Sequence, residues 1–421
     1  MSTENAQQIS ADVVIVGGGM VGTSLALLLA RKLPKASIIL VEKAPFSKNA
    51  SSVKQSLTYS TSFDARSTAI SESSRNLFDQ LGLWQQLAEH LTAIHQVHVS
   101  DRGHVGATTM NAEELELPAL GYVLENHWLG EVLLSALQAE SAIQVISAAT
   151  VTDARVSLPG VSLVLTNGQQ ISGNLLLIAD GANSATRDLL GIGHKVSNYG
   201  QSAIIANVSL AQPHQQVAYE RFTENGPVAL LPLVDYEGKP RSALIWTVTT
   251  EQATQLLALS ETELMSQLQN WFGHRLGKLQ DLGERTSYPL QRVTSDELYR
   301  RSVAVVGNAA TALHPVAGQG FNLALRGISV LGELLGEAWA EGRPLGDLEL
   351  LQRYGQQHQR DRQRIVSFSD TLPKLFGSKS LAVALGRNLG LLALDATPKA
   401  RKLMASLGTG TLAQSGSMRG N

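Results

Sequence analysis

Two kinds of hydrophobic pattern divide the chain. Near the start, "ADVVIV" at 11–16 and "SIILVE" at 37–42 are short, mostly apolar runs typical of strands buried in a parallel sheet. The stretch between them, "MVGTSLALLLARKL", has helical propensity and carries basic residues in its last turn. These patterns predict one βαβ unit over 11–43. The apolar runs "NLLLIAD" at 174–180 and "SVAVVGNAA" at 302–310 predict two more buried strands.

The middle of the chain shows alternation instead. Between 200 and 250, "SAIIANVSL", "PVALLPLV" and "RSALIWTVT" have the pattern of antiparallel strands, so we expect a second sheet separate from the parallel one. The segment "HQVHVSDRGHVGATTM" predicts a hairpin that turns near 101–103. Helices are expected over 64–90, over 126–140, from 251 onward and after 345, and a serine-rich loop over 47–62.

Composition excludes several classes of function. The 421 residues carry a formal net charge of -2, which gives no electrostatic footprint for nucleic acid. The chain has no cysteine, which excludes disulfides, thiolate metal sites and cysteine nucleophiles. No uncharged run reaches the roughly 20 residues that span a bilayer, and "MSTENAQQIS" lacks a signal-peptide pattern. We expect a cytoplasmic protein, at most attached to a membrane surface.

Patterns for metal binding or hydrolysis are weak. His98, Asp101, Arg102 and His104 lie together in the predicted hairpin, but a polar hairpin is the simpler interpretation, and no metal site is predicted. The sequence shows no Ser/His/Asp, HExxH or paired-carboxylate spacing, so hydrolysis has no visible apparatus. Any demanding chemistry is therefore expected to come from a cofactor.

A glycine motif, Gly17-x-Gly19-x-x-Gly22, stands between the first predicted strand and helix. Gly17 permits the tight turn, Gly19 lets a pyrophosphate approach the backbone, and Gly22 lets the helix pack closely on the sheet. The helix N-terminus offers free N–H groups and a positive dipole end to the phosphates. Glu42, 20 residues beyond Gly22, is placed to accept hydrogen bonds from a ribose. The motif predicts a dinucleotide site, but by itself it does not separate FAD from NAD.

A second candidate junction follows the strand that ends in Asp180-Gly181, within "LLLIADGANSATRDLLG". The simpler interpretation is a strand end followed by a helix that is capped by Ser184, with Arg187 in its early turns. The alternative is a second loop lying against the same dinucleotide.

The third junction lies within "SVAVVGNAATALHPVAGQGFNLALRG". A strand ends at Gly307-Asn308, and a helix begins around Gly318-Gln319-Gly320, whose N–H groups can stabilise negative charge on a docked group. Such a glycine-rich start could also mark close helix packing. One long ligand across the sheet edge would explain all three junctions. FAD is such a ligand, with its adenosine at the first junction and its isoalloxazine at the third.

These three motifs in this order resemble the group A flavoprotein monooxygenases, the aromatic hydroxylase family, over about 11–395. Within that family, "VHVSDRGHVGATTM", "ERFTENGPVALLPL" and "GNAATALHPVAGQGFNLALRG" are similar to the ubiquinone-biosynthesis hydroxylases. The resemblance implies tightly but non-covalently bound FAD, with NAD(P)H as a transient electron donor. O2 would then add at flavin C4a, and the ring of a polyprenylated phenol, 2-polyprenyl-6-methoxyphenol, would be hydroxylated.

Transferred residue by residue, the resemblance also implies a set of FAD contacts. Arg66, in "FDARSTAIS", matches an arginine near the flavin, and Asp180-Gly181 matches a motif associated with both FAD and NAD(P)H. No protein group is expected to be catalytic beyond the flavin, which would be faced by Pro315, Gly318, Gln319 and Gly320. The cofactor-binding candidates are Gly17, Gly19, Met20, Gly22, Glu42, Lys43, Arg66, Asp180, Gly181, Gly307, Asn308, Pro315, Gly318, Gln319, Gly320, Phe321 and Asn322.

Three positions depart from the family pattern. The usual Gly-Asp of the third motif is Gly307-Asn308, which removes a charge beside the ribityl chain. His127 stands where many relatives have an arginine, which puts one phosphate contact in doubt. Gly327 replaces the aspartate that often follows the motif arginine, and the sequence predicts no consequence.

The predicted fold is α/β: a Rossmann-like FAD-binding domain (glutathione-reductase-like, aromatic hydroxylase type) interleaved with a mixed or antiparallel-sheet substrate domain, plus C-terminal helices. The FAD-binding domain is expected over 1–75, 115–190 and 285–345, the substrate domain over 76–114 and 191–284, and a helical segment with a frayed tail over 346–421. The apolar segments between 200 and 250 would form one wall of the substrate pocket, although the simpler interpretation of most of their apolar residues is hydrophobic core.

Expected partners are the phenol, O2 and NAD(P)H, with other subunits of a ubiquinone-biosynthesis complex as a further interpretation. The basic, apolar segment "PKLFGSKSLAVALGRNLGLLALDATPKARKL" suggests peripheral contact with the cytoplasmic face of the inner membrane, although packing on the FAD domain or a partner is simpler. Two other functions stay open: an FAD-dependent reductase or dehydrogenase of related fold, and a non-catalytic flavin-stabilised subunit.

Overall fold

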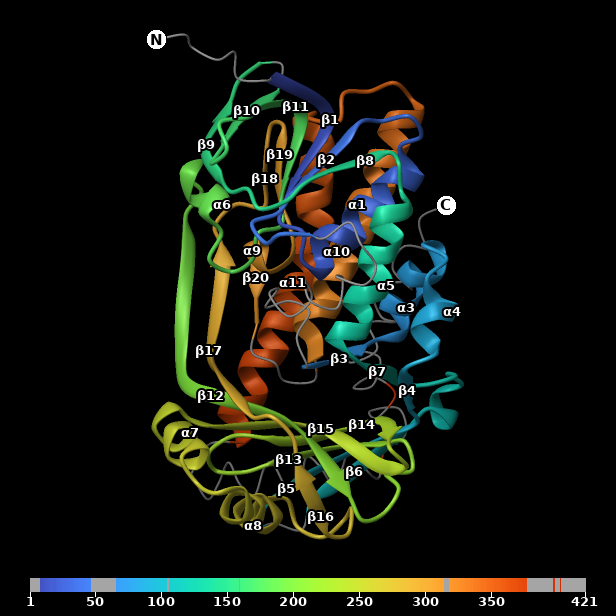
Figure 1. Cartoon of the computed structure of the whole chain (residues 1–421), viewed down its shortest axis with the longest axis vertical. Helices are drawn as coiled ribbons and strands as arrows, with labels where there is room; N and C mark the ends of the chain where they lie inside the picture. The colour runs from blue at the N-terminus through green and yellow to red at the C-terminus, as the bar shows by residue number, and fades with distance from the viewer. Residues whose placement is uncertain are drawn as a thin grey trace.

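The computed structural model describes residues 8–46, 66–103, 106–158, 160–313 and 318–376, together with positions 397 and 402. Two sheet-based parts are stacked along the long axis in Figure 1, a parallel sheet with its helices at one end and a large antiparallel sheet at the other. The long strands β12 (His194–Leu210) and β17 (Thr286–Ser295) run from one part to the other. The predicted α/β fold is confirmed.

The first sheet has the strand order β18-β19-β11-β1-β2-β8, with β9 and β10 added beside β11. Its strands are β1 (Gln8–Val16), β2 (Ile38–Val41), β8 (Ile143–Ile146), β9 (Val151–Val156), β10 (Val161–Leu165), β11 (Gln170–Ile178), β18 (Tyr299–Arg300) and β19 (Val303–Val305). Strand β1 pairs in parallel with both β2 and β11, and β11 pairs in parallel with β19. The predicted βαβ unit and both later buried strands are therefore confirmed.

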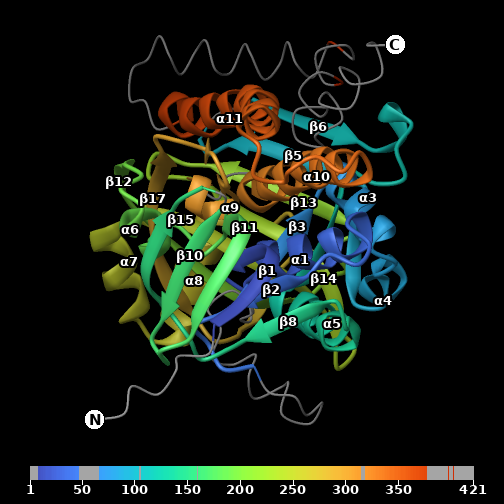
Figure 2. The same cartoon turned by 90° about the horizontal axis from the view of Figure 1, so that it is seen from above.

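Helices cover one face of this sheet. They are α1 (Met20–Lys32), α5 (Asn126–Ala139), α10 (Gln319–Ala340) and α11 (Leu348–Phe376). Figure 2 shows α10 and α11 on the same side of the sheet, and residues of all four helices share one buried apolar cluster with alternate residues of β1, β2 and β11. The short helices α6 (Ala185–Leu189) and α9 (Gly307–Ala310) follow β11 and β19.

The second sheet has the strand order β20-β17-β12-β15-β14-β13-β5-β6, with β16 beside β12. Its remaining strands are β5 (Gln96–Asp101), β6 (Ala107–Asn111), β13 (Val217–Phe222), β14 (Val228–Tyr236), β15 (Lys239–Thr249), β16 (Leu279–Leu282) and β20 (Thr311–Ala312). One face is buried against α7 (Thr250–Leu257) and α8 (Glu261–Phe272), where Trp246 and Phe272 are almost fully enclosed. The predicted antiparallel sheet and the hairpin of β5 and β6 are confirmed.

A third, small sheet joins the two parts. It consists of β3 (Ser67–Ile70), β7 (Gly121–Glu125) and β4 (Leu91–Ile94), accompanied by α3 (Glu72–Gln80), α4 (Trp84–Ala88) and the 3-10 turn η1 (Glu113–Leu115). The expectation of a helix over the whole of 64–90 was wrong, because residues 67–70 pair with the backbone of β7. The helix begins only after Ser71, whose hydroxyl accepts a hydrogen bond from the Ser74 N–H.

The predicted domain limits stay a prediction, although the hydrogen-bonded sheets place β17 with the antiparallel sheet and the apolar cluster places α3 and α4 with the parallel one. In the part of the chain that the structure describes, no helix is long and apolar enough to cross a membrane. The serine-rich segment over 47–62 and nearly all of the basic, apolar C-terminal segment lie outside the described residues.

Candidate functional site

The first glycine motif forms a tight turn between β1 and α1. Gly17 has a φ of +105°, and a Cβ added there would lie 2.5 Å from the Ala179 carbonyl group at the end of β11. A Cβ on Gly22 would collide with the carbonyl oxygen of Gly17. Helix α1 begins at Met20 without a side-chain cap and without an acidic residue in its first turn. Its N-terminal N–H groups and dipole therefore favour an anion.

Glu42, at the end of β2, already holds this turn in shape. Its buried carboxylate accepts hydrogen bonds from the Gly18 N–H at 2.5 Å and from the Ala44 N–H at 2.9 Å. Because each carboxylate oxygen can accept a second hydrogen bond, the predicted ribose contact is compatible with this geometry and stays a prediction. Lys43 follows with an exposed side chain.

The second junction contains a buried acceptor that fits a ligand. Oδ2 of Asp180 accepts a hydrogen bond from the Thr186 N–H at 3.1 Å, whereas Oδ1 is buried without a partner among the described residues. Leaving such an acceptor unsatisfied costs about 1–3 kcal/mol, so a hydroxyl donor of a bound cofactor fits here. Gly181 has a φ of +94°, and no described atom lies within 4 Å of an added Cβ. Ser184 also caps α6, as the simpler interpretation predicted, since its hydroxyl accepts from the Arg187 N–H.

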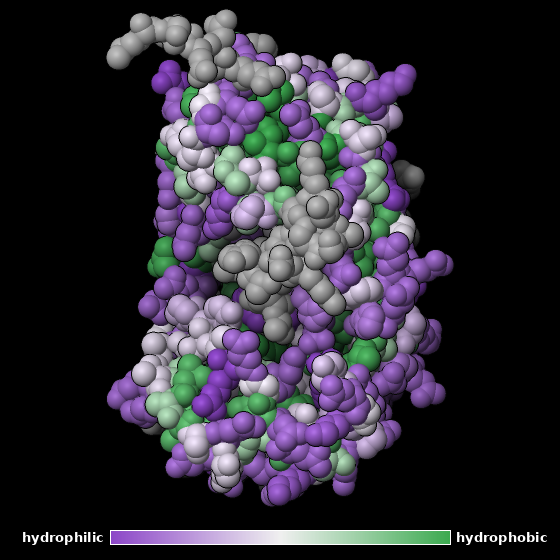
Figure 3. Space-filling view, viewed as in Figure 1, coloured by the Kyte–Doolittle hydropathy of each residue, from purple (hydrophilic) through white to green (hydrophobic). Residues whose placement is uncertain are grey.

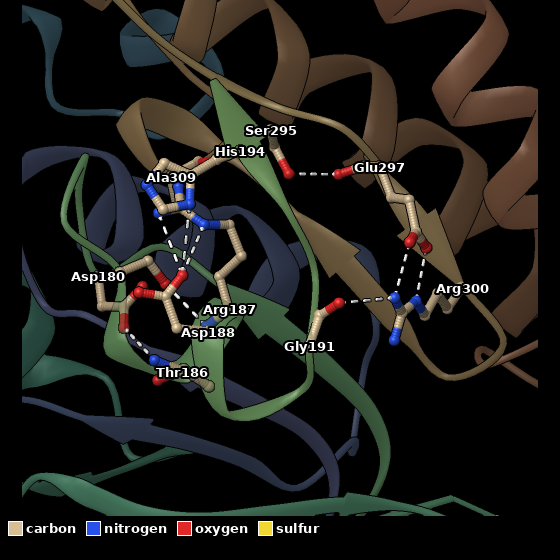
Figure 4. Close-up of polar contacts among 11 residues, drawn as sticks. Asp180, Thr186, Arg187, Asp188, Gly191, His194, Ser295, Glu297, Arg300 and Ala309 are labelled. Atoms are coloured by element: carbon tan, nitrogen blue, oxygen red, sulfur yellow. Dashed lines mark hydrogen bonds and ion pairs between the residues drawn. The ribbon is translucent and has the colours of Figure 1, made fainter. Parts of the chain in front are cut away.

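Arg187 links the second junction to the third, a role that sequence reasoning missed. Its side chain is fully buried, and Nη1 donates to the Ala309 carbonyl oxygen at 3.0 Å (Figure 4). Nε also lies 3.4 Å from Oδ1 of Asp188. Because Ala309 directly follows Asn308, this guanidinium fixes the loop after β19 against the loop after β11. Its position early in the short helix after β11 was the only signal in the sequence.

The third junction begins where β19 ends. Gly307 has a φ of +60°, and an added Cβ would lie 3.1 Å from Cγ1 of Val21 on α1, so the glycine lets the two elements approach. Asn308 is exposed at the start of α9, where its amide is accessible to a ligand. These three strand ends meet around the N-terminus of α1, because β1 lies between β2 and β11 and β19 lies beside β11.

The start of α10 lies beside the small third sheet. Gly318 is its N-cap with a φ of +62°, and an added Cβ would lie 3.2 Å from that of Ala69. Oδ1 of Asn322 accepts from the Ser71 N–H at 2.8 Å, while Nδ2 donates to the carbonyl oxygens of Ala69 and Gly318 at 2.8 and 2.9 Å. Asn322 thus fastens α10 to β3, and its amide serves the protein backbone.

The other candidates of this region differ in their surroundings. Gln319 is buried, and Phe321 is half-buried against the apolar cluster of the helices. Gly320 is half-buried, and the nearest described atom to an added Cβ is that of Leu313 at 4.0 Å. Pro315 lies outside the described residues.

Arg66 connects the third sheet to the antiparallel sheet. Its guanidinium carbon lies 4.6 Å from the ring centroid of Tyr288 on β17, and its carbonyl oxygen accepts from the Asn126 N–H at the start of α5. His127, one of the departures from the family pattern, follows with an exposed side chain in the first turn of α5. A histidine there lacks the planar, five-donor guanidinium with which an arginine binds phosphate.

Gly327, another departure, now has a structural explanation. A Cβ at this position would lie 2.7 Å from Cε1 of His358, which is buried on α11. The imidazole stacks on Tyr354 at a ring-centroid distance of 5.7 Å, and the Tyr354 hydroxyl donates to the Val305 carbonyl oxygen. The glycine therefore makes room for a histidine that joins α11 to α10, and burial lowers the pKa of His358 to about 4.

Three glycine-bearing strand ends around one helix N-terminus, beside an antiparallel sheet, define a flavin-binding oxidoreductase. A family model described as "FAD binding domain" matches residues 10–369. The chain is 33% identical over 402 residues to the ubiquinone hydroxylase UbiL of Rhodospirillum rubrum, covering 96% of this chain and 90% of that protein. It is 31% identical to the 3-demethoxyubiquinol 3-hydroxylase of Escherichia coli, covering 91% and 94% of the two chains.

A solved structure agrees with these comparisons at the level of the fold. The crystal structure of PqsL, a probable FAD-dependent monooxygenase from Pseudomonas aeruginosa, superimposes with a TM-score of 0.75 at 20% identity, covering 91% of this chain and all of that one. The chain belongs to the FAD-dependent monooxygenases, and within them to the family of the ubiquinone-biosynthesis hydroxylases. The predictions of family, enzyme class and FAD as cofactor are thereby confirmed.

Proposed function

We propose that this enzyme hydroxylates the ring of 2-polyprenyl-6-methoxyphenol in ubiquinone biosynthesis, using O2 and NAD(P)H. The observation that carries the proposal is the glycine-lined FAD cradle, with its unsatisfied Asp180 acceptor, in a chain whose antiparallel sheet turns an aliphatic face toward it. The names of the relatives, a ubiquinone hydroxylase and a 3-demethoxyubiquinol 3-hydroxylase, support the choice of substrate class.

The residues around the three strand ends would hold the cofactor. The N–H groups at the start of α1 would bind the pyrophosphate, Glu42 the adenosine ribose, and Asp180 a hydroxyl group. The first N–H groups of α10 would stabilise negative charge on the flavin ring. Bound FAD, reduced by NAD(P)H, supplies the electrons that activate O2 for transfer of one oxygen atom.

The antiparallel sheet would supply the substrate wall. Alternate residues of β12, β14 and β15 face away from α7 and α8, and Ile205, Leu231 and Ile245 on that face are only half-buried. Figure 3 shows the molecule hollowed where its two parts meet, with hydrophobic surface at the edge of the hollow. An aliphatic wall suits a prenylated ring and keeps water away from the reacting atoms.

A polyprenylated phenol partitions into lipid, so we also propose that the enzyme works at the membrane surface, in contact with other enzymes of the pathway. Flotation of the purified protein with vesicles containing anionic lipid tests this proposal. Binding that falls with salt and is lost on removal of residues 377–421 would support it, and a protein that stays with the soluble fraction would contradict it.

Mass spectrometry of quinone lipids from cells that lack this protein tests the reaction itself. We expect a polyprenyl-methoxyphenol one oxygen short of the next intermediate to accumulate, and wild-type protein to remove it. At Gly320 the nearest described atom to an added Cβ lies 4.0 Å away, so Gly320→Val should fold. Its side chain would occupy space proposed for the flavin ring, so the variant should fail to complement. Gly336→Ala, on the same helix, serves as the active control because an added Cβ makes ordinary contacts, the nearest at 3.5 Å. A product that differs by hydrogens alone would instead indicate a reductase.

A further inference from the structure

The carboxyl group of Glu220 lies on the same face of the antiparallel sheet as the proposed substrate wall. Glu220 lies on β13, in register with Val99 of β5 on one side and Ala229 of β14 on the other. The same cross-strand row continues through Ile245 of β15 to Ile205 of β12. Side chains in register point to the same face of a sheet, so the carboxyl group of Glu220 stands in a row of aliphatic residues.

This face points toward the flavin region. The alternate residues Tyr219, Leu230 and Leu244 belong to the opposite face, because they pack with α7 and α8. On the face of Glu220, Asn207 donates to Oε1 of Glu125 at the end of β7, at 2.9 Å. Tyr288, in register with Ala203 on the same face, lies under Arg66. Both contacts reach the small third sheet, which carries the start of α10 through Asn322.

Glu220 combines a half-buried side chain with a strongly shifted carboxyl pKa. Its side chain keeps some accessible surface, yet burial raises the pKa of its carboxyl group to about 7, and no charged residue contributes to that shift. Among the described residues, its carboxylate has no hydrogen-bond or ion-pair partner.

The titratable groups on the same face of the sheet do not pair with the carboxyl group of Glu220. Asp101 lies in the next row of the same face, in register with Phe222, and carries the same sign of charge as Glu220. The guanidinium of Arg241 is bound to Glu125, at 3.1 Å, and Arg66 lies over Tyr288 on the far side of β12. A carboxylate without a counter-ion among aliphatic side chains is unfavourable for folding. Its position is therefore better explained by a ligand.

We propose that Glu220 receives the phenolic hydroxyl group of the substrate, accepting its hydrogen bond and then its proton, while the aliphatic residues of the same row hold the ring and the first isoprene units. The proton leaves the phenol oxygen for a carboxylate oxygen, the bonding pair stays on the phenol oxygen, and the proton returns to the product. The electron-rich phenolate ring is the form that accepts an electrophilic oxygen atom. This inference rests on the proposed function and adds a catalytic residue to it.

The same arrangement sets a limit on the substrate. A carboxylate on the ring would bring a second negative charge close to Glu220 among aliphatic side chains, which is unfavourable at short range. The enzyme should therefore accept a prenylated phenol and reject the corresponding prenylated hydroxybenzoate. The site would thus act after the reaction that decarboxylates the ring.

The test compares the FAD-loaded wild type with Glu220→Gln, which keeps the shape of the side chain but cannot take a proton. Glu224→Gln is the matched control, since Glu224 is exposed in the turn that follows β13. The probes are 2-geranylphenol and 3-geranyl-4-hydroxybenzoate, with NAD(P)H oxidation, product formation and flavin spectral changes measured between pH 5.5 and 9. We expect E220Q to lose hydroxylation by about 100-fold or more, to lose the pH dependence near neutrality, to keep FAD, and to melt no lower than the wild type.

Each other outcome would contradict the assignment. If E220Q hydroxylates 2-geranylphenol with the wild-type rate and pH profile, the role of Glu220 is refuted and the proposed function stands. If E220Q instead loses FAD or melts at a lower temperature, Glu220 is structural. Equal turnover of the hydroxybenzoate refutes the limit on substrates. A wild type that neither binds nor hydroxylates 2-geranylphenol overturns the proposed function and this inference together.

Discussion

Replacing Gly327 by alanine tests the contact between α10 and α11. The added Cβ would lie 2.7 Å from Cε1 and 3.0 Å from Nδ1 of His358, whose ring is buried and stacked on Tyr354. Overpacking of this kind costs about 1–3 kcal/mol, whereas alanine in a helix interior gains up to about 1 kcal/mol over glycine. The net prediction is a loss of up to about 2 kcal/mol in the free energy of unfolding, measured by urea denaturation of the FAD-loaded protein.

The control lies on the same helix. At Gly336 the nearest atom to an added Cβ is Cβ of Lys32 at 3.5 Å, so Gly336→Ala should stabilise the protein by up to about 1 kcal/mol. Truncating His358 to alanine removes the obstacle, so Gly327→Ala should become stabilising in that background. If Gly327→Ala alone stabilises the protein as much as Gly336→Ala, the proposed packing is refuted.

Three further predictions concern buried polar groups. The pKa of His358 is lowered to about 4 from 6.5, so on acidification the unfolded chain takes up a proton before the folded one. The stabilising contribution of the neutral imidazole should therefore be fully present above pH 6.5, and the free energy of unfolding should fall by up to about 3 kcal/mol toward pH 4. His358→Leu should remove this pH dependence from the free energy of unfolding measured by urea denaturation at each pH. The pKa of Glu220 is raised to about 7 from 4.5, so its effect on stability has the opposite pH dependence. Its contribution to the free energy of unfolding is fully present below pH 4.5 and is lost as the pH rises through 7. Glu220→Gln should therefore raise stability at pH 8 by about 1–3 kcal/mol, and an unchanged or lower melting temperature would contradict this. Arg187→Met should leave the Ala309 carbonyl oxygen without its hydrogen bond and lower the free energy of unfolding by about 1–3 kcal/mol. It should also weaken FAD binding, measured by flavin fluorescence. An unchanged affinity for FAD would exclude the role given to Arg187.

Local rules explain which parts of the site were predictable from the sequence. The positive φ of Gly17 and the contact of Gly22 with the Gly17 carbonyl oxygen arise within one βαβ unit, so spacing sufficed to predict glycine at both positions. Contacts between distant segments were not predictable in the same way. Asn322 bonds to Ser71, 251 positions away, a contact that no local pattern in the sequence indicates.

The same reason explains what the sequence did not reveal. Arg187 meets Ala309 across 122 positions, and only the folded chain brings the two loops together. The strand over 67–70 exists because β7 pairs with it, which overrides the helical pattern that follows. Glu220 could be recognised only from the register of β13 with β5 and β14, which places it on the face away from α7 and α8.

The central claim is that this chain uses FAD to insert one oxygen atom from O2 into a prenylated phenol. The most direct test is turnover of 2-geranylphenol by the purified, FAD-loaded protein with NAD(P)H under ¹⁸O2, followed by mass spectrometry. The account predicts a ring-hydroxylated product that carries one ¹⁸O atom and is formed only with both NAD(P)H and O2. A product without the label, or a phenol recovered unchanged while NAD(P)H is consumed, would contradict it.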